Sequence, residues 1–241
     1  SYARQLYRRR YERLGWRAGK SDSSDVKLLR EAVLRFMVMD VRDPQARTRA
    51  ARLGRRYLEY GTEAKPEIVD PQLAGLVLAA AVQEGDEGLF NHLVDLLVQS
   101  QDATTRNRIL AALGHAEEPA LSERALDLSL DPRLRMNEIS TVLGPQFHNP
   151  RTRDRAWQWL TDHFDALSTR LGASQVGYTP WFATSFCTDE AATEVEHFFA
   201  PKVAGLPGGP RNLASTIEEI SLCAEKAKVY RPAVEATFAH R

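Results

Sequence analysis

The sequence lacks every residue pattern that commonly marks a catalytic centre. It contains no His-Glu-x-x-His, and none of its six histidines has another histidine three to five residues away, so no zinc-binding pair forms on a helix. A Gly-x-Ser-x-Gly elbow, a phosphate-binding glycine loop and a dinucleotide fingerprint are absent too. We therefore expect no catalytic residue, metal ligand or cofactor in this chain.

Long apolar runs and an excess of either charge are also absent. No apolar run approaches the roughly 20 residues that a membrane-spanning helix needs, so we expect no membrane span. The chain has 32 Lys+Arg and 32 Asp+Glu, which gives a formal net charge of zero. General nucleic-acid binding needs a basic excess, and we expect none here.

Cysteine is scarce. Cys187 and Cys223 are too few for a disulfide framework or a thiolate metal site. We interpret both as free, buried side chains that pack as small apolar residues.

The start of the chain, Ser1-Tyr2, has neither an initiator methionine nor the features of a signal peptide. This suggests that the chain begins inside a longer polypeptide. The sequence favours neither a cytoplasmic nor a periplasmic or secreted location.

Basic residues are concentrated near the N-terminus. The arginines of this region are Arg8, Arg9, Arg10, Arg13, Arg17, Arg47, Arg49, Arg52, Arg55 and Arg56. A solvated helical face is the favoured interpretation, because charge runs usually form one. A docking surface for an acidic partner or a neighbouring domain is the alternative.

Apolar residues recur at three- and four-residue steps through almost the whole chain, and strand signals are nearly absent. This period predicts an all-α fold of helices that each bury one face. Expected helix starts are Asp43-Pro44, Asp102, Asp131-Pro132, Asn149-Pro150 and Thr188-Asp189. Expected helix stops, each with a left-handed glycine, are Gly61, Gly114, Gly144 and Gly172.

The helix starts are regularly spaced. Gly85-Asp86, Glu118-Pro119 and Asn149-Pro150 each precede an expected helix and lie roughly 32 residues apart. Second helices are expected from Asp102 to Gly114 and from Asp131 to Gly144. A repeated helix pair is typical of an α-solenoid, because one pair cannot bury its apolar face alone. We predict a HEAT-like α-α superhelix of antiparallel helix pairs.

The last third of the chain carries an ordered set of packing motifs. They are the run from Asn149 to Leu160, a helix ending near Leu171-Gly172, Phe186-Cys187-Thr188, Glu194 to Phe199, and Arg211 to Ile220. This order resembles the C-terminal helical domain of the aminopeptidase N family, the gluzincin zinc aminopeptidases, including the antigen-trimming enzymes of the endoplasmic reticulum. Leu14-Gly15-Trp16, followed by Leu28-Leu29-Arg30, resembles the opening helices of that domain. The resemblance covers nearly the whole chain, so we treat residues 1–241 as one domain.

The resemblance implies that the chemistry lies elsewhere. Members of the family carry an N-terminal β domain and a thermolysin-like domain with Gly-x-Met-Glu-Asn and His-Glu-x-x-His motifs, and zinc would be bound there. The resemblance implies that these domains of the parent chain, and peptide substrates, are the partners. In the family the helical domain closes over the active site, limits which peptides enter and can contact the distal end of the substrate.

Candidate peptide-binding residues follow from the expected solenoid, whose concave face is formed by the second helix of each pair. Guanidinium and amide groups on those helices and the later turns suit a peptide carboxylate. The candidates are Arg106, Arg108, Arg135, Asn137, Gln175 and Arg211, with His148 where the family often has a basic residue. A solvated or structural role is the alternative for each.

We therefore expect a C-terminal, non-catalytic domain of a zinc aminopeptidase, inactive alone, that shapes peptide access. The alternative is a stand-alone helical-repeat scaffold that binds a protein partner through its concave face.

Overall fold

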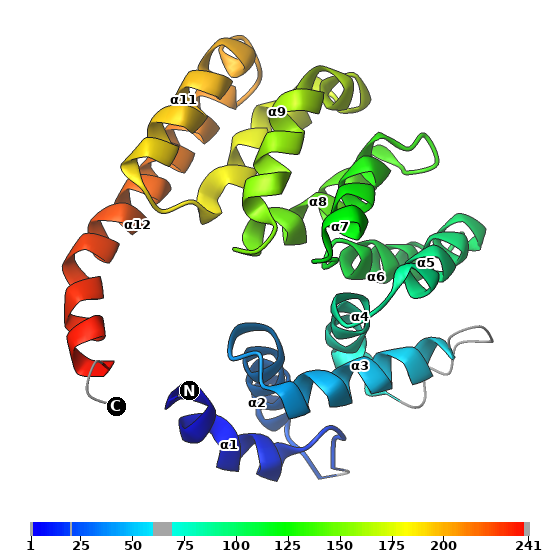
Figure 1. Ribbon diagram of the computed structural model, residues 1–241. Coiled ribbons are helices and arrows are strands. Elements are labelled where there is room, and N and C mark those ends of the chain that lie inside the picture. Colours follow the sequence, from blue (N-terminus) through cyan, green and yellow to red (C-terminus); the bar gives the residue numbers. More distant parts are fainter. Residues whose placement is uncertain (1, 20, 60–68, 239–241) are drawn as a thin grey trace. The chain divides into compact units, whose positions relative to one another are not determined.

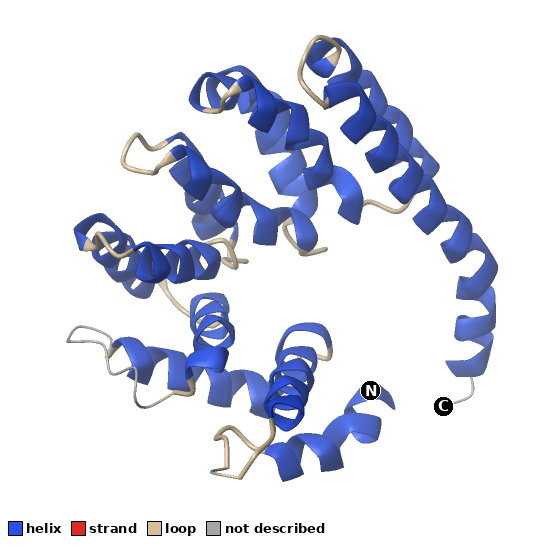
Figure 2. Cartoon of the chain, turned by 180° about the vertical axis from the view of Figure 1, so that it is seen from behind, coloured by secondary structure: helices blue, strands red, loops and turns tan. Residues whose placement is uncertain are grey.

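The computed structural model describes residues 2–19, 21–59 and 69–238, and these residues form helices and loops without a β-strand (Figure 2). The predicted all-α fold is confirmed, and the superhelix stays a prediction. Gly61, expected to end a helix, lies outside the described residues. Within the described residues, no helix is long and apolar enough to cross a membrane.

The helices cluster into two compact units, Ser1–Ala125 and Leu126–Arg241. The first contains α1 (Tyr2–Leu14), α2 (Ser24–Arg35), the π-helical turn η1 (Phe36–Asp40), α3 (Pro44–Leu58), the 3-10 turn η3 (Pro71–Leu73), α4 (Ala74–Gln83), α5 (Glu87–Gln99), α6 (Ala103–Leu113) and most of α7 (Pro119–Asp127). Within it α3 packs on α4, and α4 and α5 both pack on α6 (Figure 1).

The α4 helix forms the core of the first unit. Its residues from Leu76 to Val82 are all buried, so the helix has no solvent-facing side over two turns. A helix that is apolar all round must be covered by its neighbours. Here α3 and α6 cover it.

The contact between α3 and α4 depends on Gly54. A Cβ added to Gly54 would lie 2.1 Å from the carbonyl oxygen of Val77 and 2.8 Å from the Cβ of Ala81. Only a residue without a side chain allows the two backbones to approach this closely.

Aspartate side chains begin three helices of the first unit. Asp43 Oδ1 accepts a hydrogen bond from the Ala46 amide at 2.8 Å, and Asp86 and Asp102 cap α5 and α6 in the same way. The predicted starts at Asp43, Asp86 and Asp102 are confirmed. Gly114 ends α6 as expected, but with a right-handed φ of −60°.

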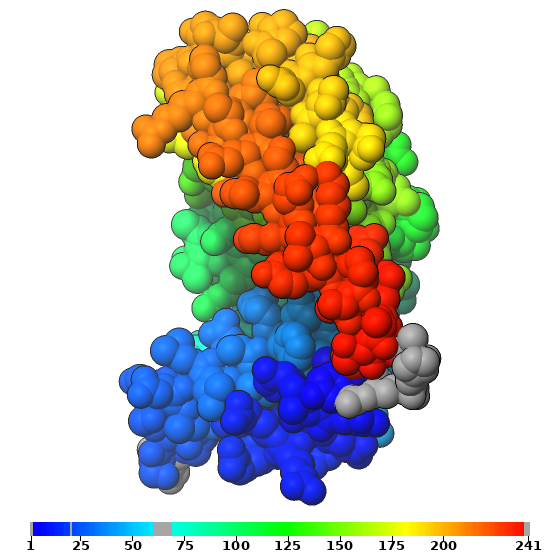
Figure 3. All heavy atoms as spheres, turned by 90° about the vertical axis from the view of Figure 1, so that its left-hand side faces the viewer, coloured from blue at the N-terminus to red at the C-terminus, as the bar shows by residue number. Residues whose placement is uncertain are grey.

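The second unit contains the 3-10 turns η4 (Leu128–Leu130) and η5 (Met136–Glu138), then α8 (Ile139–His148), α9 (Arg153–Arg170), α10 (Ala173–Tyr178), the 3-10 segment η6 (Thr179–Ser185), α11 (Asp189–Val203) and α12 (Gly209–Phe238). Within it α8 packs on α9, and α11 packs on α12. The C-terminal half of α12 extends past the end of α11 and is exposed (Figures 1 and 3).

Two predicted helix starts in the second unit are wrong. Asp131 Oδ1 accepts a hydrogen bond from the Arg133 amide at 2.8 Å, and Asn149 Oδ1 accepts one from the Arg151 amide at 3.0 Å. Asp and Asn stabilise such two-residue turns as readily as helix caps. The helices α8 and α9 begin several residues later, whereas the predicted start at Thr188 is confirmed.

Two predicted helix stops also need correction. Gly144 lies inside α8, and a Cβ added to it would meet nothing within 4 Å. Gly172 follows the end of α9 as expected, but its φ is −75° and it begins α10. The left-handed glycines among the described residues are Gly15 and Gly208.

Aromatic side chains fill the space between α9 and α11. The ring centroid of Trp157 lies 5.4 Å from that of Phe198, and the centroids of Phe164 and Phe199 are 5.8 Å apart. Trp157 Nε1 also donates a hydrogen bond to Glu194 Oε1 at 2.6 Å. Edge-to-face pairs of this kind fix the two helices against each other.

The interpretation of the cysteines as free and buried is wrong. Cys187 and Cys223 form a disulfide with a Cα–Cα distance of 5.0 Å, and both residues are half-buried. The bond joins the loop before α11 to the middle of α12. Two cysteines 36 residues apart gave no local signal of this pairing, because the packing of α11 on α12 brings them together.

We expect Gly54→Ala to lower the free energy of unfolding by about 3 kcal/mol, because the new methyl group would push α3 away from α4. Gly75→Ala is the matched control, since a Cβ at Gly75 meets nothing within 4 Å. It should raise the free energy of unfolding by up to about 1 kcal/mol through helix propensity. Urea unfolding of both variants measures these free energies. Equal changes in the two variants would contradict the close approach of α3 to α4 at Gly54.

Replacing both Cys187 and Cys223 by serine should lower the free energy of unfolding by about 3 kcal/mol, because the unfolded chain regains the freedom of a 36-residue loop. Thiol titration of the unfolded, unreduced protein should find no free thiol. Two free thiols, or unchanged stability of the double variant, would show that the disulfide does not form.

Candidate functional site

No group of three or more His, Cys, Asp or Glu side chains in the described part of the chain could hold a metal ion. Burial, with Arg35 nearby, lowers the pKa of His115 to about 4, so its imidazole is neutral at pH 7. The candidate sites are therefore pockets that could bind a ligand or a partner.

Arg106 is a buried residue of α6. Its side chain donates hydrogen bonds from Nη1 to the carbonyl oxygens of Leu97 at 2.6 Å and Ser100 at 3.3 Å. These carbonyls lie at the end of α5, where the helix leaves them without intrahelical partners. Arg106 therefore joins the end of α5 to the start of α6.

Arg108 lies two residues further along α6 and borders a pocket of about 320 Å³. Its Nη1 is 3.5 Å from the hydroxyl oxygen of Tyr57, which projects from α3. The apolar walls of the pocket come from Leu58, Leu78, Leu96 and Ile109. Gln99, Ser100 and Thr105 also line the pocket. A partly apolar pocket with a guanidinium and several neutral polar groups suits a ligand that has both an apolar group and a carboxylate.

Arg135 and Asn137 do not lie on a second helix, contrary to the prediction from the helix spacing. Both precede α8 and are exposed, with the backbone amide of Arg135 bonded to Glu138 Oε2 at 2.8 Å. Gln175, also exposed, lies close to this turn, because a Cβ on Gly172 would meet both Gln175 Oε1 at 2.9 Å and Met136 Sδ at 4.0 Å. The structure therefore places Gln175 and Met136, the residue before Asn137, on Gly172, and it shows no contact between Asn137 and Gln175 among the described residues.

Arg211 and His148 are exposed at two further places in the second unit. Arg211 lies in the first turn of α12 next to Asn212, whose Nδ2 donates to the Gly177 carbonyl at 2.8 Å and so anchors α12 to α10. His148 ends α8, at the opposite end from Asn137, with its Nδ1 2.8 Å from the Gly144 carbonyl oxygen.

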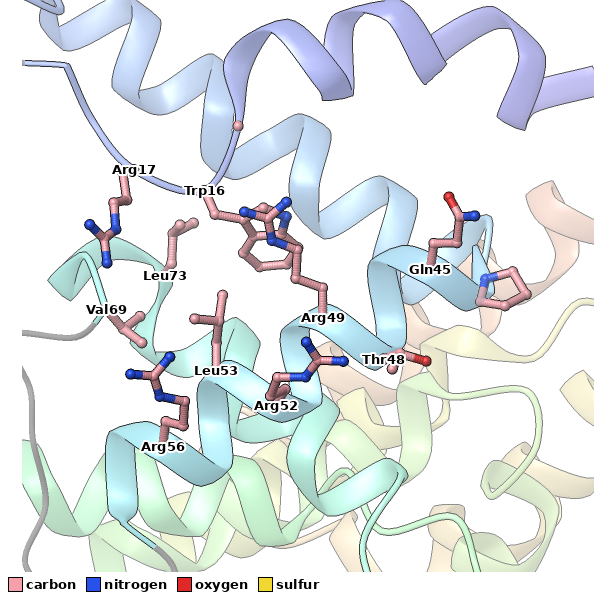
Figure 4. Close-up of a pocket in the computed structure, with 12 residues that line it drawn as sticks. Trp16, Arg17, Gln45, Thr48, Arg49, Arg52, Leu53, Arg56, Val69 and Leu73 are labelled. Carbon is pink, nitrogen blue, oxygen red and sulfur yellow. The ribbon is translucent and has the colours of Figure 1, made fainter.

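A pocket of about 930 Å³ in the first unit is bordered by four arginines, Arg17, Arg49, Arg52 and Arg56. We call it the arginine pocket. Arg17 comes from the loop after α1 and the others from α3, and Figure 4 shows Arg17 and Arg56 reaching toward each other from opposite walls. The apolar residues Trp16, Leu53, Val69 and Leu73 form its floor.

The basic residues of the arginine pocket could be found in the sequence, but the pocket itself could not. The spacing of Arg49, Arg52 and Arg56 places them along one face of a helix, which the sequence does reveal. The contribution of Leu73 depends on the packing of α3 on α4. Tyr57, 51 residues before Arg108, was missed for the same reason.

A protein-family model described as "ERAP1-like C-terminal domain" matches residues 1–222. The chain belongs to this family. The resemblance inferred from the packing motifs is thereby confirmed.

Relatives of this ERAP1-like C-terminal domain include three proteins named as aminopeptidases. Glutamyl aminopeptidase of Homo sapiens is 27% identical over 231 residues, 93% of this chain and 23% of that protein. Aminopeptidase M1-D of Oryza sativa subsp. japonica is 22% identical over 215 residues, with coverages of 88% and 24%. Alanine/arginine aminopeptidase of Saccharomyces cerevisiae (strain ATCC 204508 / S288c) is 24% identical over 220 residues, with coverages of 86% and 24%.

The chain spans about a quarter of the length of these relatives. It corresponds to the C-terminal domain of an aminopeptidase, and its described residues contain no metal-binding cluster.

In this ERAP1-like C-terminal domain, Arg106→Ala and Arg108→Ala should have different effects on stability. Arg106→Ala should lower the free energy of unfolding by about 2 kcal/mol or more, because buried carbonyl oxygens lose their donor. Arg108→Ala should change it by less than about 1 kcal/mol, since Arg108 is partly exposed. Chemical denaturation of both variants tests this, and a larger loss for Arg108→Ala would contradict the two assignments.

Proposed function

We propose that this chain is the non-catalytic C-terminal domain of a zinc aminopeptidase, which closes over the active site of the rest of the polypeptide and shapes the access of peptides to it. The proposal depends above all on the family match over residues 1–222, in a chain whose described residues hold no metal-binding cluster. Zinc and the hydrolysis of N-terminal residues would then belong to the other domains.

The pocket around Arg108 is our candidate for contact with the far end of a peptide. A free peptide carboxylate would accept charge-assisted hydrogen bonds from Arg108, and the Tyr57 hydroxyl could add another. An apolar side chain of the last residue would lie against Leu78, Leu96 and Ile109. A dipeptide-sized substrate would be too short to reach such a site while its N-terminus is at the zinc.

The exposed residues of the second unit are secondary candidates for peptide contacts. Asn137 and Gln175 are exposed, and the amide of each could bind a peptide backbone. Arg135, His148 and Arg211 are exposed cationic or ionisable groups. Arg106 would support Arg108 by fixing the start of α6.

In the longer polypeptide, Arg108→Ala should raise KM about tenfold for a peptide with a free C-terminal carboxylate, because a charge-assisted hydrogen bond is lost. The same peptide with an amidated C-terminus should be hydrolysed equally by both forms. Hydrolysis of an aminoacyl-4-nitroanilide should also be unchanged, since this substrate does not extend to the pocket. Steady-state kinetics on the three substrates measures these effects.

Arg151→Ala is the matched control, because Arg151 is an exposed arginine outside the pocket. It should leave all three substrates unaffected. If Arg108→Ala raised KM as much for the amidated peptide as for the peptide with a free carboxylate, a carboxylate site at Arg108 would be contradicted. Absence of any aminopeptidase activity in the longer polypeptide would overturn the proposed function and favour a stand-alone scaffold.

A further inference from the structure

The arginines of the arginine pocket have no carboxylate partner in the part of the chain that the structure describes. The first 59 residues contain 16 Lys+Arg but only 7 Asp+Glu, although the whole chain is neutral. Arg49, Arg52 and Arg56 recur at three and four residues on α3, and together they extend over about 10 Å of helix. Like charges at this spacing repel one another and destabilise the free domain.

Other arginines of the same unit are paired. Arg42 donates to both carboxylate oxygens of Glu117 at 2.6 and 2.8 Å, and Arg47 Nε donates to Glu84 Oε1 at 2.7 Å. Arg4 Nε lies 2.7 Å from Asp43 Oδ2, and Arg30 is bonded to Asp22. These four arginines therefore form ion pairs with carboxylates among the described residues of the same unit, and the arginines of the arginine pocket do not.

The apolar residues of the arginine pocket restrict the chemical class of ligand that fits it. Trp16 is 5% exposed, and Arg49 Cζ lies 5.9 Å from the centroid of its ring. Leu53 and Leu73 line the same pocket. Val69 and Leu73 are likewise at most 5% exposed, so among these apolar residues only the half-buried Leu53 offers appreciable surface to a ligand. A ligand that uses the whole pocket must carry carboxylates together with apolar groups.

We propose that the arginine pocket is a docking surface for an acidic, partly apolar protein segment of the same longer polypeptide. Aspartate or glutamate side chains of this segment pair with Arg52 and Arg56, and an apolar side chain contacts Leu53. The choice of occupant rests on the proposed function, in which about three quarters of the polypeptide lies outside this chain, as in its relatives.

The first test measures binding of a synthetic peptide of Glu and Leu to the chain by fluorescence or calorimetry. The peptide should bind, and its affinity should fall as salt rises, because exposed ion pairs are screened. The Arg52→Glu/Arg56→Glu variant should bind at least about tenfold more weakly. A peptide with Gln in place of Glu, and inorganic phosphate, should bind much more weakly than the acidic peptide.

Arg9→Glu/Arg10→Glu is the matched control, because both arginines are exposed on α1 and the change in net charge is the same. It should retain binding within about twofold. The proposal would be overturned if the acidic peptide did not bind, or if both variants lost the same affinity for it. Phosphate binding as tight as that of the peptide would also overturn it. Circular dichroism confirms that both variants are folded.

The second test identifies the source of the acidic segment. Phenylglyoxal labelling, read by mass spectrometry, should modify Arg52 and Arg56 several-fold more slowly in the longer polypeptide than in the chain alone, with Arg9 and Arg10 as internal references. Equal labelling rates would overturn docking within the same polypeptide, even if aminopeptidase activity is present. Loss of labelling in an inactive polypeptide would instead refute the proposed function and leave the docking surface standing.

Discussion

The first unit depends on the burial of α4, which has no solvent-facing side between Leu76 and Val82. Its neighbour α3 must approach closely enough to cover it, and Gly54 makes this approach possible. Because the face of α3 with Ala46, Ala50 and Gly54 is committed to the core, its other face must point away from α4. That outer face carries Arg49, Arg52 and Arg56 of the arginine pocket, so one packing constraint determines both the core and most of the exposed charge.

The same packing creates the second pocket of this unit. Arg106 and Arg108 are two residues apart on α6 and therefore point in different directions. One is buried against the end of α5, while the other borders an apolar pocket opposite Tyr57. If both proposals hold, Arg108 contacts substrate and the arginine pocket contacts the rest of the polypeptide. A domain without a metal cluster in its described residues thus has two places at which it could influence a distant active site.

Local features could be predicted from the sequence, and long-range ones could not. Asp43 and Asp102 were recognised as helix caps, because capping depends only on the next few residues. Asp131 was assigned wrongly, because aspartate stabilises a turn through the same amide contacts. The burial of Arg106 depends on the packing of α5 on α6, which no spacing reveals. The Cys187–Cys223 bond likewise depends on the packing of α11 on α12.

The central claim is that this chain regulates peptide access and supplies no catalytic residue. The most direct measurement separates this chain from the remainder of the longer polypeptide and determines zinc content and peptide hydrolysis for each piece and for their mixture. We predict that all bound zinc and all turnover belong to the remainder, and that adding this chain changes its preference between long peptides and aminoacyl-4-nitroanilides. Zinc-dependent turnover by this chain alone, or an unchanged preference in a mixture that forms a complex, would contradict the claim.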